Sequence, residues 1–495
     1  MAESLTKEGS ETPPSRAGLA RNAFHLVLGQ AATTAMAVFL SAALGRGLGP
    51  AEFGLYFLLT TMAAFAFVLV EWGQSTSVVR DVARSPEKAA TYLGTILGLR
   101  IVGTAAAAGV TALTSRLLGH PGRTSALAAL LVVAMLPFFL TQAYCTIFRG
   151  RERMDYEAIT SVLNKALTFV LTLAALGAGL GLVGVILAQG VAGLGALGAT
   201  VFLARRLDIS PVRGTLDSVR EVLAHGTPIV AIAIASSAQG YIDAIVLSKL
   251  TPEPVVGWFG AAKNIVGTLF APAAILGTAA FPRLAKAAHD PPQFRLELHS
   301  AMRPLLGLAA LAGVGTYLFA DVAVNIVFGR KGFGPAGTTL KALSPGLALL
   351  FVDVMVATAI VALGRARQVA LAKAFNVAAI TVLDILLIPI FQTRFGNGGI
   401  GQGVAFAGGE VIMLASALWI VPSGVIDTSF FWDMGRALAA AVATLVVFRL
   451  LPSWPVFVTL PGCVIVFAAF AGAVGLVRRA EIETFRGLLL RRRRG

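Results

Sequence analysis

The fold is decided by stretches such as residues 29–71, which read GQAATTAMAVFLSAALGRGLGPAEFGLYFLLTTMAAFAFVLVE. Two apolar runs flank the short segment LGRGLGPAEFG, and each run approaches the roughly 20 residues that a helix needs to cross a bilayer. The first run is too long for the core of a cleaved signal peptide. The stretch therefore predicts two transmembrane helices joined by a Gly- and Pro-containing turn.

The composition extends this interpretation to the whole chain. Of 495 residues, 57% are hydrophobic and 13% are charged, and the mean hydropathy is +0.81. Soluble domains carry about 25% charged residues, so this chain has too few to cover soluble domains of its length. The two cysteines, Cys145 and Cys463, lie in apolar runs, which excludes a disulfide framework. The chain is predicted to be an all-α integral membrane protein.

Apolar runs bounded by charge, Gly or Pro predict about fourteen transmembrane helices. Their centres lie near residues 33, 64, 105, 136, 167, 191, 238, 268, 315, 353, 380, 410, 441 and 466.

The positive charges orient these helices. The net charge is +15, and Lys and Arg gather in alternate loops, near 80–88, 149–153, 205–220, 283–303 and 365–367, and in the tails. Loops rich in Lys and Arg stay in the cytoplasm, so both termini are expected there. The basic C-terminal tail is expected to bind anionic membrane lipid, and no nucleic-acid partner is expected.

Three pairs of similar segments indicate an internal duplication. Gly54-Leu55-Tyr56 is echoed by Gly257-Trp258-Phe259, GTAAAAGV at 103–110 by GLAALAGV at 307–314, and GRER at 150–153 by GRAR at 364–367. Each repeat unit holds six spans, an even number, so the two copies enter the membrane from the same side. We therefore expect two parallel-repeat six-helix lobes around a central cavity, plus two extra C-terminal helices.

This organisation divides the chain into six segments. They are an N-terminal cytoplasmic tail (1–21), a first lobe (22–205), a cytoplasmic linker (206–226), a second lobe (227–422), two additional helices (430–477) and a basic cytoplasmic tail (478–495).

Ionisable residues inside the predicted spans are the candidate functional residues, because a charge at the centre of a bilayer needs a partner or a wet cavity. Four cations are candidates for binding an anionic head group such as a diphosphate: Arg100, Lys165, Lys263 and Lys373. Four acids are candidates for ion coupling, as proton or cation sites, or for sugar contact: Asp243, Asp353, Asp384 and Glu410. Structural alternatives stay open: Asp243 and Lys263 could neutralise each other, and Arg100 could extend to the interface.

The chain lacks the motifs of ATP-driven pumps and zinc peptidases. Neither G-x-x-x-x-G-K-[ST] nor H-E-x-x-H occurs. No catalytic residue, metal or cofactor is therefore expected, and any driving force must come from a gradient.

Several spaced motifs resemble one family. They are LGRGLGPAEFGLYFLL (44–59), FRGRERMDYEAI (148–159), YIDAIVLSKLTPEPVVGWFGAAKNIVG (241–267), FPRLAKA (281–287) and FGRKGFGPA (328–336). The chain is similar to the polysaccharide-transporter branch of the multidrug/oligosaccharidyl-lipid/polysaccharide exporter superfamily. Asp243 and Lys263 match positions that are charged in this family.

The resemblance implies a flippase of the inner membrane rather than an enzyme. Its substrate would be a polyprenyl-diphosphate-linked oligosaccharide for surface polysaccharides such as O-antigen or lipopolysaccharide, moved by alternating access. A polysaccharide polymerase and glycosyltransferases would be its partners. Three alternatives stay open: a cation-coupled multidrug exporter of the same superfamily, a membrane-embedded glycosyltransferase or acyltransferase, and a non-transporting component of a glycan-assembly complex.

Overall fold

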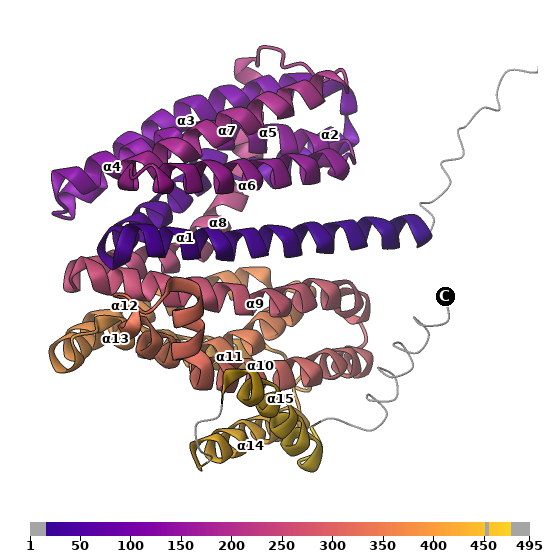
Figure 1. The fold of residues 1–495 in the computed structure, drawn as a ribbon. Coiled ribbons are helices and arrows are strands. Elements are labelled where there is room, and N and C mark those ends of the chain that lie inside the picture. Colours follow the sequence, from indigo (N-terminus) through magenta and orange to yellow (C-terminus); the bar gives the residue numbers. More distant parts are fainter. Residues whose placement is uncertain (1–15, 451–454, 477–495) are drawn as a thin grey trace, which may run out of the picture.

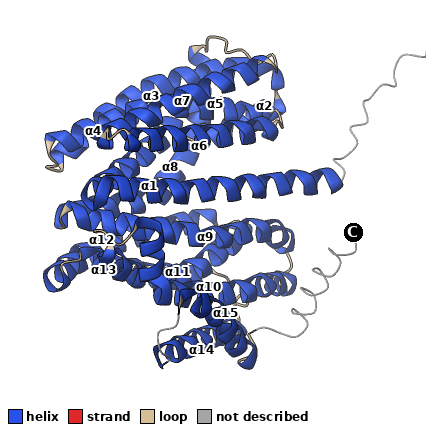
Figure 2. Ribbon diagram, in the orientation of Figure 1, coloured by secondary structure: helices blue, strands red, loops and turns tan. Residues whose placement is uncertain are grey.

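The structure, a computed structural model, describes residues 16–450 and 455–476. This described part is helical throughout apart from its connections, as Figure 2 shows, and its one isolated β-bridge joins Ser423 to Ile426. The basic tail predicted at 478–495 lies outside the described residues, so its binding to anionic lipid stays a prediction.

Fifteen α-helices and one short 3₁₀ turn, Pro86–Lys88, make up the described chain. The helices are α1 (Arg16–Glu71), α2 (Gln74–Arg84), α3 (Ala89–Leu117), α4 (Gly122–Ala134), α5 (Leu136–Gly150), α6 (Met154–Gly177), α7 (Gly181–Arg205), α8 (Leu216–Leu250), α9 (Glu253–Ala287), α10 (Pro291–Phe328), α11 (Gly334–Ala362), α12 (Ala366–Phe395), α13 (Gly398–Ile420), α14 (Thr428–Leu450) and α15 (Val456–Ala473).

Helix α1 holds the first two predicted spans. It bends at Gly49, whose φ of +75° is accessible to glycine at little cost, and the following Pro50 has no backbone N–H to donate. The other twelve predicted centres also fall within helices. Among the described residues, 12 segments are long and apolar enough to cross a membrane, counting Met36–Arg84 as one and leaving out α8. Helix α8 has 35 residues, about 50 Å of helix, which exceeds the hydrocarbon thickness.

The helices form two lobes, as predicted (Figure 1). Helices α2 to α7 pack with one another in the first lobe, and α9 to α13 pack with one another in the second. Helix α1 lies between the lobes and contacts both α6 and α9. Helix α8 connects them, because it packs on α2 and α3 of the first lobe and on α12 of the second.

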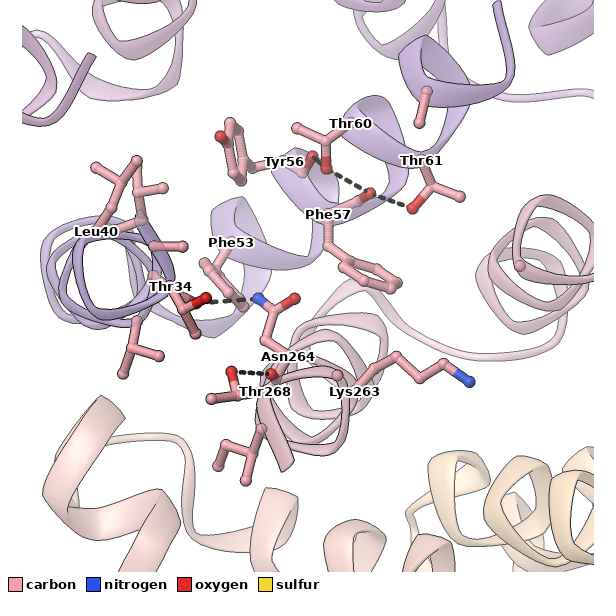
Figure 3. Close-up of a pocket in the computed structure, with 18 of the residues that line it drawn as sticks. Thr34, Leu40, Phe53, Tyr56, Phe57, Thr60, Thr61, Lys263, Asn264 and Thr268 are labelled. Carbon is pink, nitrogen blue, oxygen red and sulfur yellow. Dashed lines mark hydrogen bonds between the residues drawn. The ribbon is translucent and has the colours of Figure 1, made fainter. Parts of the chain in front are cut away.

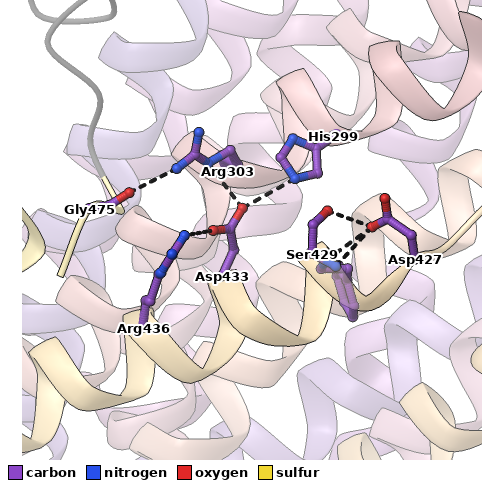
Figure 4. Close-up of polar contacts among 8 residues, drawn as sticks. His299, Arg303, Asp427, Ser429, Asp433, Arg436 and Gly475 are labelled. Carbon is purple, nitrogen blue, oxygen red and sulfur yellow. Dashed lines mark hydrogen bonds and ion pairs between the residues drawn. The ribbon is translucent and has the colours of Figure 1, made fainter.

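The two additional helices are attached to the second lobe by a buried ion pair (Figure 4). Arg303 of α10 lies 3.0 Å from Asp433 of α14, and both side chains are 4% exposed. Asp433 also pairs with His299 and Arg436, while Arg303 donates a hydrogen bond to the carbonyl oxygen of Gly475. Helices α14 and α15 therefore dock on α10 through charge as well as apolar contact.

We expect Asp433→Ala to lower the free energy of unfolding by about 3 kcal/mol, because it leaves a buried guanidinium without its carboxylate. The readout is the melting temperature of the purified protein in detergent. The double variant Arg303→Met with Asp433→Leu should recover most of the loss, because an apolar pair replaces the ion pair. Equal melting temperatures for Asp433→Ala and the parent would contradict this role.

Candidate functional site

A cavity of about 900 Å³ lies between the two lobes (Figure 3). Its wall is built by both halves of α1, by α6 of the first lobe, by the middle of α8, by α9 and by the end of α10. This is the central cavity predicted from the duplication. Its volume falls in the range of small-molecule sites, about 300–1,000 Å³.

Each lobe contributes one lysine to the cavity. Lys165 comes from α6 and Lys263 from α9, and both belong to the wall. Of the four predicted substrate-binding cations, these two line the same cavity.

Hydroxyl and amide groups make the rest of the polar wall. Asn264 Nδ2 donates to Ser41 Oγ at 2.9 Å, which joins α9 to the first half of α1. Thr60 and Thr61 donate to the backbone carbonyls of Tyr56 and Phe57, so their oxygens keep acceptor capacity toward the cavity. The wall can therefore exchange hydrogen bonds with a polar guest.

The cavity is closed at one end by direct contact between the lobes. Gly54 of α1 and Gly257 of α9 cross so closely that a Cβ on Gly54 would lie 2.6 Å from the backbone nitrogen of Gly257. A Cβ on Gly257 would overlap the carbonyl oxygen of Pro50. Only glycine allows two backbones to approach this closely. These glycines occupy equivalent positions in the duplicated motif, so the contact joins the two repeats at matching points.

An aromatic cluster seals the same end. The Phe53 ring packs edge-on against Phe328 and Phe333, with centroids 5.4 and 5.7 Å apart. Arg46 then donates from the first half of α1 to the backbone carbonyls of Ile326 and Val327 at the end of α10. This end carries the short connections that the distribution of Lys and Arg predicts to face away from the cytoplasm.

The four predicted acids lie inside the second lobe and are absent from the cavity wall. The exposed fractions of Asp243, Asp353, Asp384 and Glu410 are 5% or less. Asp243 of α8 and Asp384 of α12 interact with each other, and Glu410 of α13 interacts with Asp353 of α11. The structure thus gathers the four candidate ion-coupling acids into one acidic network. Their position away from the cavity wall does not favour the alternative of sugar contact.

Several oxygens of this network have no hydrogen-bond partner among the described residues. They are Oδ1 of Asp353, Oε2 of Glu410 and Oδ1 of the neighbouring Asn376. The carboxylate of Asp384 meets only that of Asp243, and no hydrogen-bond donor of the described chain reaches it. Buried carboxylates without partners are costly unless they carry a proton or hold a cation. The network is therefore suited to take up a positive charge.

Lys373 belongs to this acidic network and does not line the cavity. It lies on α12, and its charge acts on Asp353 and Glu410. The spacing of Lys373 and Asp384 on one helix face was visible in the sequence. Which neighbouring helices that face meets depends on packing: Asp384 meets Asp243 of α8, and Lys373 acts on Asp353 of α11 and Glu410 of α13.

Arg100 requires a correction. Its side chain is fully buried in the first lobe, where Nε donates to Gln74 Oε1 at 3.0 Å and Nη1 donates to the carbonyl oxygen of Phe139. Arg100 therefore ties α3 to α2 and α5 and has no access to the cavity. Burial of a guanidinium in the membrane is costly, and the hydrogen bonds to Gln74 and Phe139 offset part of that cost.

The structure also shows positions beside the cavity that sequence reasoning missed. The motif containing Gly54 and Gly257 was recognised as a repeat, but its role in closing the cavity was not predicted. The signal was present in the sequence, because the two glycines occupy equivalent positions of the duplicated motif.

Comparisons with known proteins support the fold. The structure is similar to the lipid II flippase MurJ in an inward closed conformation, with a TM-score of 0.72 and 14% identity over 90% of this chain and 98% of that chain. It is also similar to an inward-facing multidrug resistance MATE family transporter of the MOP superfamily, with a TM-score of 0.64 and 18% identity over 78% and 93% of the two chains. A MOP superfamily transporter from Pyrococcus furiosus gives a TM-score of 0.54 and 18% identity over 81% and 94%. A search of curated proteins found no match to the sequence.

The fold and the cavity together define a multi-pass membrane protein with the two-lobe architecture of these flippases and exporters. Residues 19–288, more than half of the chain, match the family model described as polysaccharide biosynthesis protein. The chain belongs to this family. The resemblance drawn from the sequence motifs is thereby confirmed.

Proposed function

We propose that this protein is a flippase that carries a polyprenyl-diphosphate-linked oligosaccharide across the inner membrane by alternating access. The observation that carries the proposal is the cavity between the lobes, with one lysine from each lobe in its wall. Charge-assisted hydrogen bonds to phosphate are the strongest polar contacts that such a wall can offer. Lys165 and Lys263 are the proposed diphosphate ligands, and neither Arg100 nor Lys373 is retained in this role.

The physical need for such a cavity lies in the cost of desolvation. A sugar diphosphate that crosses about 30 Å of hydrocarbon alone loses its hydrogen bonds to water. A wet cavity with hydroxyls, amides and two ammonium groups replaces those bonds, while the polyprenyl chain stays in lipid between the lobes. The closed end at Gly54 and Gly257 would face the outside, so the conformation described here would accept substrate from the cytoplasm.

The acidic network of the second lobe is the proposed coupling site. Uptake of a proton or a monovalent cation there would relieve the unpartnered carboxylate oxygens of Asp384 and Glu410. Because α8 contacts both lobes and carries Asp243, a change of charge at this residue acts on the helix that connects them. The gradient of that ion would then bias which side of the cavity is open.

A multidrug exporter of the same superfamily is the second candidate. The fold is shared with MATE transporters, and the acidic network would suit cation coupling. The cavity itself argues against organic cations as substrates. Among the described wall residues the only charged side chains are Lys165 and Lys263, and both are cationic. Two positive charges repel a cationic drug and attract an anionic head group.

The test of the proposal is the lipid-linked intermediate that accumulates when the protein is deleted. We expect a polyprenyl-diphosphate oligosaccharide to build up on the cytoplasmic leaflet, with loss of surface glycan and an unchanged drug-resistance profile. Normal surface glycan with increased drug sensitivity would contradict the flippase and support the exporter. Glycosyltransferases would act before this step, and a polysaccharide polymerase would act after it.

A further inference from the structure

We propose that Lys263 is shared between the cavity and the acidic network, so that the diphosphate and the coupling carboxylates compete for its charge. This inference rests on the proposed flippase function and assigns how its two sites communicate. Lys263 then has a positioning role for coupling in addition to its contact with the head group.

The position of the ammonium group is the first observation. Lys263 belongs to the cavity wall, yet its Nζ lies 4.3 Å from the centroid of the Phe406 ring, inside the second lobe. In Figure 3 its side chain extends away from Asn264 and from the helix that carries Thr34. A cation over an aromatic face is held more weakly than by charge-assisted hydrogen bonds to phosphate. The lysine is therefore held loosely at the boundary between the two sites.

The charges around Lys263 are the second observation. Asp243 of α8, Asp384 of α12 and Glu410 of α13 all feel its charge. No direct ion pair joins Lys263 to these acids in the described part of the chain. Asp353 of α11 and Lys373 of α12 also act on Glu410. The other lysine of the cavity wall is Lys165 of α6. Lys263 is thus the cation common to the cavity and the acids.

The duplication supplies a third observation. Counting six residues from the crossing glycines, Gly54 leads to Thr60 and Gly257 leads to Lys263. Both side chains line the cavity. Equivalent positions of the two repeats thus carry a neutral group in the first lobe and a cation in the second. The lysine is placed in the lobe that holds the acidic network.

Coupling follows from Coulomb's law and linkage. When a diphosphate draws the ammonium of Lys263 into the cavity, Asp243, Asp384 and Glu410 lose a cation that acts on all three. A proton or a cation then compensates them. By reciprocity, a network that already holds that positive charge leaves Lys263 free for phosphate. Diphosphate binding and ion uptake therefore favour each other.

The experiment measures binding of farnesyl diphosphate to the full-length protein in lipid nanodiscs across a pH series. We expect the affinity of the parent protein to rise as the pH falls, by about tenfold. Lys263→Gln should bind more weakly and lose this pH dependence, and Lys263→Arg should retain it. Asp243→Asn should bind more tightly than the parent at high pH and show a smaller pH dependence, because Asp384 and Glu410 still act on Lys263.

The matched control is Lys165→Gln, which removes the other cavity lysine. It should weaken binding and keep the pH dependence of the parent, because Lys165 is not adjacent to the network. Titration of the probe itself is common to all variants, so their differences report the protein. A pH dependence in Lys263→Gln equal to that of the parent would overturn the shared role of Lys263 and leave the proposed flippase function standing. Failure of the parent to bind farnesyl diphosphate at any pH would overturn the proposed function and this inference with it.

Discussion

Replacing Gly257 with leucine should abolish transport while leaving the protein folded and in the membrane. A side chain at this position overlaps the Pro50 carbonyl and the backbone at Gly54, so the lobes cannot meet at the closed end of the cavity. Overpacking of this kind costs about 3 kcal/mol. That cost applies only to the conformation in which the lobes touch, and it shifts the balance of conformations about 100-fold toward the state open at this end.

The measurement is labelling of a cysteine introduced at Thr268, which lines the cavity. The native thiols of Cys145 and Cys463 are buried and give little background. A membrane-impermeant maleimide added outside should label Thr268→Cys in the Gly257→Leu background much faster than in the parent. The matched control is Gly109→Leu on α3, where an added Cβ meets no atom within 4 Å. Unchanged transport by Gly257→Leu would contradict the role of the crossing.

The fold could be predicted closely from the sequence because a membrane restricts the secondary structures that a chain can adopt. In hydrocarbon every backbone group must be satisfied within the helix, so long apolar runs such as 181–205 leave no alternative. The boundary at Gly49 and Pro50 was equally clear, because both residues have strong backbone preferences. The duplication then gave the two lobes and the cavity between them.

The functional residues were predicted less well, because a sequence shows the depth of a charge but not the direction in which it points. Arg100 and Lys165 both lie on membrane-spanning helices, yet Arg100 is held by Gln74 inside the first lobe and Lys165 lines the cavity. The difference depends on which neighbours α3 and α6 pack against.

The acids illustrate the same limit. Asp243 and Asp384 lie on helices that line or border the cavity, and helical periodicity alone allows either face to point inward. The contact between α8 and α12 turns both carboxylates into the second lobe. Of the two roles predicted for these acids, ion coupling therefore stays the proposal, and sugar contact is not retained.

Lys165→Gln should reduce transport of the lipid-linked oligosaccharide by at least about tenfold, since loss of a charge-assisted contact to phosphate costs about 1.5–3 kcal/mol. Lys165→Arg should retain most of the activity, because a guanidinium also binds phosphate. The matched control is Lys341→Gln, because Lys341 is another lysine of the chain but pairs with Asp321 away from the cavity. The readout is surface glycan together with the amount of protein in the membrane. Normal surface glycan in Lys165→Gln cells would remove this residue from the site.

The central claim is that the cavity between the lobes holds the diphosphate, and it is tested most directly by a cryo-electron microscopy map of the protein with a bound polyprenyl-diphosphate oligosaccharide. The predicted result is density for the phosphates between Lys165 and Lys263, with the sugar inside the cavity. Phosphate density outside the cavity, or a substrate bound only on the lipid-facing surface of either lobe, would contradict the account.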